Sequence, residues 1–371
     1  MNDKFYTSPL SGKVIDLEKP FDVLMLAVAD SSNSGIKQAM CLEHLGFDVV
    51  FYKGLPHEFE YPIQAPIHWA LSEPMCRWEH GFIIHAPQLK SLVEKAKVVY
   101  FHASMFIDTG ADLSDKFIVV NHQGSTYRKH SQVVNQLFNS IADKTIVYAD
   151  LMNMGCTNEV LFYRPVETNL LRPVYEPQGE KLIIGHFPST PANKGTENIL
   201  QVIKKLKSDP TTRDKFEYVG ISEVIPWTST ARHGDPKKYW VPWKDQINRY
   251  RQCDIIIESL LLELHGRKFG EWGNTAIEAS SLGKIVITNS LTAEVYKEEF
   301  GVDSELNIAN SKKDLEDTLR KIFALSSEEL QEKKQRTREW IKKNHNIAAA
   351  ADQLWEKVYK WSPLERKGDA V

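Results

Sequence analysis

The sequence has 371 residues, of which 42% are hydrophobic and 26% are charged, and its formal net charge is -3. This length predicts two domains, and the near balance of 46 basic and 49 acidic residues excludes a global positive field that would attract nucleic acid. No apolar run, Phe21–Ala29 included, approaches the roughly 20 residues that span a bilayer. The first residues lack the apolar core of a signal peptide, and the 4 cysteines are scattered. We therefore expect a cytoplasmic protein without a transmembrane segment, and peripheral membrane contact stays open.

Several chemistries are excluded by spacing. The 19 glycines form no G-x-G, so the dinucleotide fingerprint is missing, and there is no Walker loop, no G-x-S-x-G and no H-E-x-x-H. No two aspartates are separated by one residue, so the D-x-D metal clamp of many sugar transferases is missing as well. We expect no bound metal and no cofactor, and any phosphate must be bound without these devices.

The first half alternates short β-branched runs with amphipathic segments, which predicts parallel strands covered by helices. A polar turn at Ser34-Gly35 begins the first helix, which we expect to reach about Leu45. The segment Leu55–Pro87 is aromatic and rich in proline and histidine, and it predicts an elaborated loop. The expected strands are Phe21–Ala29, Asp48–Tyr52, Val98–His102, Phe117–His122 and Thr145–Tyr148.

A second alternation begins near Lys181, after a link over Leu161–Gly179 that contains several prolines. Its expected strands are Lys181–His186, Phe216–Val219, Ile255–Ser259 and Ile285–Thr288. Its expected helices begin near Gly195, Asn274, Lys312 and Ser326.

These elements predict an α/β protein with two doubly wound domains, a layout that binds ligands at the ends of its strands. We place the N-terminal domain at residues 1–165 and the C-terminal domain at residues 166–345. Residues 346–371 form a helical tail that we expect to pack back on the N-terminal domain.

A lysine and a glycine lie between a predicted strand and a predicted helix, within the segment His186–Thr196. Lys194 precedes Gly195, and the first N–H groups of the helix follow. A lysine, a permissive glycine and a helix start together favour the binding of an anion, so the segment predicts a phosphate site. Plain turn chemistry is the alternative, because a Lys-Gly pair often begins a helix without any ligand.

A second motif extends from Gly270 to Ile287, where a loop with two glycines leads into a short helix and then a buried strand. We expect Glu278 in the first turn of that helix, where the helix dipole favours a carboxylate that can accept hydrogen bonds from two ribose hydroxyls. A helix-start glutamate without any function is the alternative.

Together these motifs resemble the C-terminal domain of GT-B glycosyltransferases, most closely family 4, the retaining enzymes that use nucleotide sugars. The H-x-P-S-x-x-x-x-K-G-T and G-x-x-A-I-E-A-x-x-x-G-K elements occur there in this order, and the resemblance covers residues 21 to 345. It implies two Rossmann-like domains that face each other across a cleft, with Lys194 on the donor pyrophosphate and Glu278 on the ribose. The other donor-binding residues expected in this domain are Ser189, Gly195, Thr196, Gly273 and Asn274.

The N-terminal half contains a segment that resembles the H-G-S-x-x-R element of the same family. It runs from His122 to Arg128, with Gln123 inserted after the histidine. The resemblance implies that His122 hydrogen-bonds the donor sugar and counts among the catalytic residues with Lys194. Arg128 is a candidate for a donor or acceptor phosphate, with a surface salt bridge as the alternative.

Two further residues of this half are candidates for donor binding. His102 ends a predicted strand, and a satisfied buried histidine is its alternative. Gly35 lies in the first strand-to-helix turn and would let the backbone approach the diphosphate, although Ser-Gly turns are common.

The sequence departs from the family pattern at two positions. The acidic residue expected eight positions before Glu278 is Gly270, so either Glu271 takes its catalytic role or the backbone amides that follow bind the sugar. The arginine that often precedes the lysine is Ser189, and its charge could come from Arg267 or Lys268.

Tryptophans mark two further segments. Trp69 and Trp78 either line an acceptor site or pack the insertion. Trp227, Trp240 and Trp243 surround a basic stretch that could stack a nucleobase or an acceptor ring, although a rigid loop is the favoured interpretation.

The resemblance implies a glycosyltransferase that moves a sugar from a UDP- or GDP-sugar to an acceptor hydroxyl with retention of anomeric configuration. In such a reaction the lysine and the helix start would stabilise the departing diphosphate. The expected acceptor is a glycan or a lipid-linked sugar. A hydroxymethylated DNA base is an alternative that the basic cluster Tyr127–His130 favours. A non-catalytic sugar-nucleotide-binding protein and a sugar-nucleotide epimerase are further alternatives.

Overall fold

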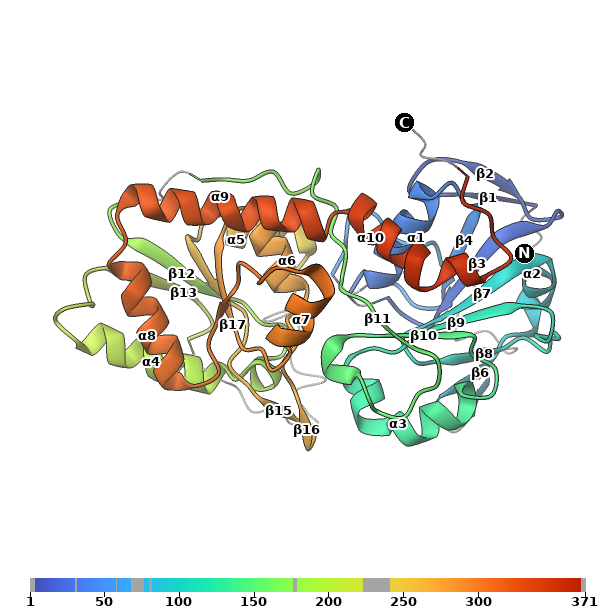
Figure 1. Cartoon of the computed structure of the whole chain (residues 1–371), viewed down its shortest axis with the longest axis horizontal. Coiled ribbons are helices and arrows are strands. Elements are labelled where there is room, and N and C mark those ends of the chain that lie inside the picture. Colours follow the sequence, from blue (N-terminus) through green and yellow to red (C-terminus); the bar gives the residue numbers. More distant parts are fainter. Residues whose placement is uncertain are drawn as a thin grey trace. The chain divides into compact units, whose positions relative to one another are not determined.

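The computed structural model describes residues 4–30, 32–57, 59–67, 77–79, 82–175, 179–222 and 241–367 (Figure 1). The chain divides into two compact units. The N-terminal unit contains Met1–Pro165 together with Ile347–Val371, and the C-terminal unit is Val166–Asn346. The C-terminal residues therefore belong to the N-terminal unit, where helix α10 (Ile347–Lys357) packs on helix α1 (Ser34–His44).

The N-terminal unit is built on a six-stranded sheet with the order β11-β10-β9-β7-β3-β4, in which every pair of neighbours is parallel. Its strands are β3 (Phe21–Ala27), β4 (Val49–Lys53), β7 (Ala96–His102), β9 (Phe117–Asn121), β10 (Lys144–Val147) and β11 (Glu159–Leu161). Smaller elements are β1 (Phe5–Thr7), β2 (Val14–Asp16), β5 (Arg77–Glu79), β6 (Ile83–His85), β8 (Phe106–Asp108) and the 3-10 turns at Pro87–Leu89, Ala149–Leu151 and Tyr359–Trp361.

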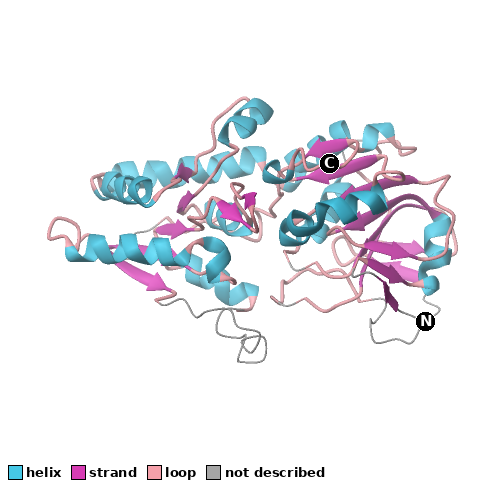
Figure 2. Ribbon diagram, turned by 90° about the horizontal axis from the view of Figure 1, so that it is seen from below, coloured by secondary structure: helices cyan, strands magenta, loops and turns pink. Residues whose placement is uncertain are grey.

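Helices cover both faces of this sheet. Alternate side chains of a strand point to opposite faces, so β3 is buried along its whole length. Leu24 and Leu26 pack in a core cluster with residues of α2 (Lys90–Lys95) and α3 (Gly124–Phe138). Val23 and Met25 pack in a second cluster with residues of α1 and α10. Figure 2 shows the strands in magenta and the covering helices in cyan.

The C-terminal unit is built on a five-stranded parallel sheet with the order β13-β12-β14-β17-β18. Its strands are β12 (Leu182–His186), β13 (Phe216–Gly220), β14 (Ile255–Ile257), β17 (Ile285–Thr288) and β18 (Asn307–Ile308), and β15 (Glu263–Leu264) and β16 (Arg267–Lys268) form a hairpin. Its helices are α4 (Thr196–Ser208), α5 (Trp243–Arg251), α6 (Asn274–Ser281), α7 (Ala293–Phe300), α8 (Lys312–Phe323) and α9 (Ser327–Asn344). Isoleucines of β12, β14 and β17 form a core cluster with apolar residues of α4 and α8, while α6 and α9 pack on β17 and on each other.

In both sheets the direction in which strands are added reverses after the first parallel strand, which is β3 in one unit and β12 in the other. The next strand along the chain lies on one side and the following strand on the other, which gives β4-β3-β7 in one unit and β13-β12-β14 in the other. The carboxyl ends of strands at such a switch point are where open α/β sheets bind ligands. The relevant ends are those of β3 and β7 in the N-terminal unit and those of β12 and β14 in the C-terminal unit.

The predicted α/β class is confirmed, and each of the nine expected strands has a counterpart in the two sheets. The described part of Leu55–Pro87 is more regular than the expected loop, because β5 and β6 pair there and β8 adds a third strand. Trp69, Trp227 and Trp240 lie outside the described residues. Within the described ranges, no helix is long and apolar enough to cross a bilayer.

Candidate functional site

The loop that carries Lys194 is fixed at the switch point of the C-terminal sheet. It leaves β12 at His186, forms a 3-10 turn over Pro191–Lys194 and enters α4 through Gly195. Gly195 has a φ of 64°, and a Cβ at this position would lie 2.0 Å from the Leu260 carbonyl oxygen. The Leu260 N–H donates to the Lys194 carbonyl at 2.9 Å. Only glycine combines this positive φ with so close a backbone approach.

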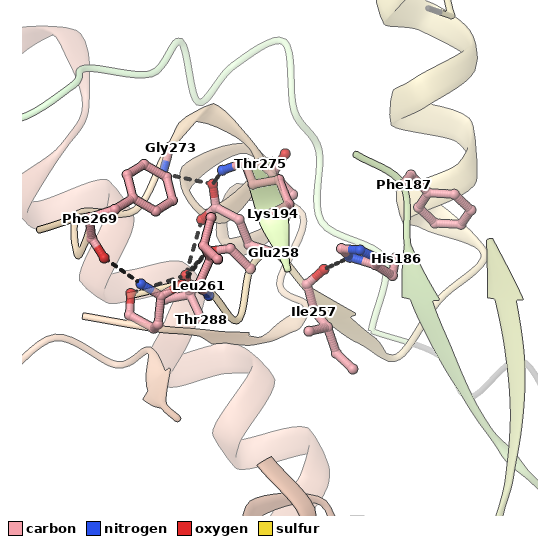
Figure 3. Close-up of polar contacts among 12 residues, drawn as sticks. His186, Phe187, Lys194, Ile257, Glu258, Leu261, Phe269, Gly273, Thr275 and Thr288 are labelled. Atoms are coloured by element: carbon pink, nitrogen blue, oxygen red, sulfur yellow. Dashed lines mark hydrogen bonds and ion pairs between the residues drawn. The ribbon is translucent and has the colours of Figure 1, made fainter. Parts of the chain in front are cut away.

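The side chain of Lys194 binds a buried carboxylate that follows β14. Its Nζ lies 3.0 Å from Glu258 Oε1, and the Gly273 N–H donates to the same oxygen at 2.7 Å (Figure 3). Glu258 is 1% exposed at its side chain, whereas Lys194 is 24% exposed. The ring of Phe269 lies 5.7 Å from the Lys194 ammonium.

The second motif begins beside this ion pair, because Gly273 is the residue that precedes α6. A Cβ at Gly273 would lie 2.7 Å from Glu258 Oε1 and 3.6 Å from Lys194 Nζ. The first N–H groups of a helix and a neighbouring ammonium both favour an anion. The structure therefore brings Lys194, Gly195, Gly273 and the half-buried Asn274 together at one edge of one sheet.

The sequence predicts Glu278 in the first turn of its helix, and this prediction is wrong. Helix α6 begins at Asn274, so Glu278 is its fifth residue, and no acidic residue lies in the first turn. The favourable interaction with the helix dipole falls off beyond that turn and does not explain this residue. Glu278 is held by the indole of Trp243 instead, whose Nε1 donates to Glu278 Oε1 at 3.2 Å.

His186 and Thr196 form hydrogen bonds that fix the two ends of the loop between β12 and α4 inside the domain. His186 Nδ1 donates to the Ile257 carbonyl at 2.8 Å (Figure 3). Its Nε2 lies 2.9 Å from Thr196 Oγ1. Burial lowers the pKa of His186 to about 4, so the imidazole is neutral at pH 7. Thr196 is buried and also reaches the Pro191 carbonyl, whereas Ser189 is exposed in the same loop.

Steric contact with the Leu291 backbone excludes an acidic side chain at position 270. A Cβ on Gly270 would lie 2.5 Å from the Leu291 nitrogen, so no side chain fits there without a backbone shift. Glu271 is buried, and Thr292 Oγ1 donates to its Oε2 at 3.3 Å. Arg267 and Lys268, the candidates for the missing arginine, are exposed on strand β16.

In the N-terminal unit a buried carboxylate occupies the start of α1. Asp30 accepts hydrogen bonds from the N–H groups of Gly35 at 2.9 Å and Ile36 at 3.0 Å, and it lies 3.2 Å from His102 Nε2. Burial opposes its ionisation, but the hydrogen bonds from His102 and from the two amides outweigh burial and hold the pKa of Asp30 at about 2. A Cβ on Gly35 would meet the ring of Phe51 at 2.7 Å. Gly35 thus serves packing, and its N–H donates inside the domain.

His122 and Gln123 follow the end of β9, and their side chains contact residues at and just after the end of β7. His122 is fully buried, stacks on Tyr127 with ring centroids 4.1 Å apart, and places Nδ1 3.1 Å from Ser104 Oγ. Burial lowers the pKa of His122 to about 3, which keeps the ring neutral. Gln123 Nε2 donates to Ser34 Oγ at 2.7 Å and lies 3.1 Å from His102 Nε2. The inserted glutamine therefore joins the start of α1 to the end of β7.

Arg128 pairs with Asp150, and both side chains are buried. Arg128 therefore forms a salt bridge, as the alternative interpretation expected, but the pair lies in the interior of the domain and not on its surface. The Arg128 side chain is therefore not on the surface of the basic cluster Tyr127–His130, whereas Lys129 and His130 are exposed.

Sequence reasoning missed two carboxylates: Glu258 follows β14 directly, and Asp30 lies three residues after the end of β3. A charged residue at that point is a recognisable signal, because the carboxyl ends of parallel strands form the ligand-binding edge of the sheet. Within the described part of the chain, no group of three or more His, Cys, Asp or Glu residues could hold a metal ion.

No family model and no curated protein sequence matches the chain. Solved structures do resemble it. An α-glucosyltransferase in complex with UDP has a TM-score of 0.61 at 9% identity, covering 91% of this chain and 99% of that chain. Anabaena HepE in complex with UDP-glucose has a TM-score of 0.60 at 11% identity, covering 92% of this chain and all of that chain. Sucrose-phosphate synthase from Thermosynechococcus elongatus has a TM-score of 0.54 at 12% identity, covering 92% and 100%.

At such identities the likeness shows the fold. The chain has the GT-B fold, with two Rossmann-like domains, as the sequence predicted.

Proposed function

We propose that this protein is a glycosyltransferase that takes a sugar from a nucleotide-sugar donor, in the manner of family 4. The observation that carries the proposal is the meeting of two motifs at the switch point of the C-terminal sheet. Lys194 lies beside the start of α6, and the same helix carries Glu278. A diphosphate and a ribose are the parts of a nucleotide that a lysine and a glutamate at this spacing would bind.

In this proposal Lys194 and the first N–H groups of α6 bind the donor diphosphate and stabilise the charge that develops as it leaves. Glu278, oriented by Trp243, accepts hydrogen bonds from the ribose hydroxyls. Glu271 takes the catalytic role of the missing acidic residue at position 270. His122 hydrogen-bonds the donor sugar through Nε2, a buried atom that has no hydrogen-bond partner among the described residues.

A UDP-sugar is the donor that we propose, with a GDP-sugar as the alternative, because structurally similar proteins were solved with UDP or UDP-glucose. We propose a glycan or lipid-linked acceptor on the N-terminal unit and retention of the anomeric configuration. Another similar structure is an α-glucosyltransferase with UDP and a 13-mer DNA, which keeps a DNA base as the alternative acceptor. The internal pairing of Arg128 removes one of the phosphate contacts on which that alternative depended. We also propose a cytoplasmic location, because the 4 cysteines are scattered along the sequence and form no metal-type pair.

The first experiment is a thermal-shift screen of the protein against UDP, GDP, ADP, CMP and their common sugar conjugates. A nucleotide at a hundred times its dissociation constant stabilises the folded state by roughly 2.7 kcal/mol. We expect a shift with UDP and UDP-sugars. A folded protein that no nucleotide stabilises would contradict the proposal.

A positive donor is then incubated with candidate acceptors, and the anomeric configuration of the product is read by NMR. Inversion would contradict the retaining assignment alone. A gel shift on hydroxymethylated duplex DNA that weakens steeply with salt would move the acceptor assignment to DNA, because phosphate contacts release counterions.

A further inference from the structure

Glu258 is a charged side chain in the interior of the C-terminal unit. It follows β14 directly, and its backbone N–H donates to the Ile287 carbonyl at 2.9 Å. Its carboxylate contacts three groups: Lys194 Nζ and the Gly273 N–H at Oε1, and Thr288 Oγ1 at 3.5 Å from Oε2 (Figure 3). A carboxylate that is 1% exposed is retained in an interior only when such partners compensate its desolvation.

The segment that begins with Glu258 holds Lys194 at both ends. The Leu260 N–H fixes the Lys194 carbonyl, and the left-handed Gly195 lies against the Leu260 carbonyl. The Glu258 carboxylate fixes the ammonium at the far end of a flexible four-carbon stem. A lysine ammonium has three N–H donors, and the contact with Glu258 uses one. Because Lys194 is 24% exposed, the remaining donors are within reach of a ligand.

The same carboxylate oxygen sets the distance between the lysine and α6. The ammonium and the Gly273 N–H both bind Oε1, and the missing side chain of Gly273 allows that approach. We propose that Glu258 is a positioning residue for phosphate recognition: it holds the Lys194 ammonium beside the start of α6, so that both meet one phosphate group. This inference rests on the phosphate role of Lys194 in the proposed function.

Two effects of Glu258 on an incoming diphosphate have opposite signs. Its negative charge repels the diphosphate, so removal of the charge alone would tighten binding. Its hold on Lys194 restricts a side chain with many rotamers before the ligand arrives, so removal of that hold would weaken binding. Positioning predicts that the second effect is larger, and the sign of the change in affinity therefore decides between them.

The experiment is a double-mutant cycle in the full chain, read by calorimetry with UDP and with uridine, or with the diphosphate and nucleoside that the screen identifies. Glu258→Gln keeps the volume and removes the charge. We expect it to weaken UDP binding about tenfold and to leave uridine binding unchanged. In a Lys194→Ala background the same substitution should have no further effect, because Glu258 acts through the lysine. Glu217→Gln, which removes an exposed carboxylate from β13, is the matched control.

Unchanged or tighter UDP binding by Glu258→Gln, equal losses for UDP and uridine, or additive losses in the double variant would each overturn the positioning role. If Glu258→Gln does not fold, Glu258→Asp tests the same role. It keeps the charge but draws the ammonium about one carbon–carbon bond away from α6, so UDP binding should still weaken, and unchanged binding would overturn the inference. If Lys194→Ala binds UDP with normal affinity, the phosphate role of Lys194 is wrong. If Lys194→Ala binds UDP more weakly but Glu258→Gln binds it normally, only the positioning role of Glu258 is wrong.

Discussion

Trp243 and Glu278 come from different helices and are joined by a hydrogen bond of 3.2 Å between the indole Nε1 and the carboxylate Oε1. Trp243 is the first residue of α5, and Glu278 lies in the second turn of α6. The bond restricts the orientation of the glutamate that we assign to the ribose. The tryptophan, which the sequence suggested as a stacking surface or part of a rigid loop, therefore contacts the proposed nucleotide site through its N–H group.

Trp243→Phe should weaken nucleotide binding by removing that N–H. A hydrogen bond to a charged group contributes about 1.5 kcal/mol, so we expect the affinity for UDP to fall about tenfold. The affinity for uridine should fall equally, because the loss is at the ribose. Calorimetry measures both, with the exposed Trp361→Phe as control. A loss confined to UDP would contradict the ribose assignment.

Lys194→Ala should lower kcat/KM at least tenfold, a loss of about 1.4 kcal/mol of transition-state stabilisation. The reason is that the lysine supplies positive charge where the departing diphosphate gains negative charge. Steady-state kinetics with the donor found in the screen measure the effect. Lys204→Ala, on the exposed face of α4, should have normal kinetics, and equal kinetics for both variants would remove the role of Lys194.

Gly195→Ala should destabilise the protein far more than Gly301→Ala. Both glycines have a positive φ, 64° and 67°, so alanine costs about 1 kcal/mol at either site. At Gly301 nothing lies within 4 Å of the added Cβ, whereas at Gly195 the Leu260 carbonyl lies 2.0 Å away. We expect a loss of at least about 3 kcal/mol at Gly195, since backbone must move. Urea unfolding compares the two, and similar losses would show that the loop relaxes easily.

Stability should fall as the pH decreases from about 6.5 toward 4. Burial depresses the pKa of His186 to about 4 and of His122 to about 3, so both rings stay neutral in the folded state. An unfolded histidine, with a pKa near 6.5, takes up a proton in this range, and each such group costs up to about 1.4 kcal/mol per pH unit. Above pH 6.5 both states are neutral and the full stability is present.

Urea unfolding at pH 7, 6 and 5 measures this slope. His186→Asn keeps an N–H donor near the Ile257 carbonyl and should reduce the slope by about one proton. An unaltered slope in this variant would show that His186 does not titrate on unfolding.

Arg128→Ala should lower stability without changing nucleotide affinity. It would leave the Asp150 carboxylate buried without its guanidinium, a change that costs about 3–5 kcal/mol. The double variant Arg128→Ala/Asp150→Ala should recover part of that loss. Unfolding curves and UDP titrations separate a structural role from a binding role, and a stable Arg128→Ala variant with weakened UDP binding would restore the role in phosphate binding.

The amino-acid sequence determined the strands, their parallel arrangement and the position of the loop between β12 and α4 that carries Lys194. These features depend on local properties that can be read from a few consecutive residues. Examples are the apolar run Ile255–Ile257 and the glycine that follows a lysine at Gly195. The order of the helices between strands then favoured a doubly wound fold.

Only the tertiary structure decided which polar groups meet. Glu258 and Lys194 are 64 residues apart, and their contact depends on the adjacency of β12 and β14 in one sheet. The same holds for Gly270, which is glycine because the Leu291 backbone lies against it, and for Arg128, which the fold pairs with Asp150 inside the domain. Long-range packing sets these distances, and no local pattern in the sequence records them.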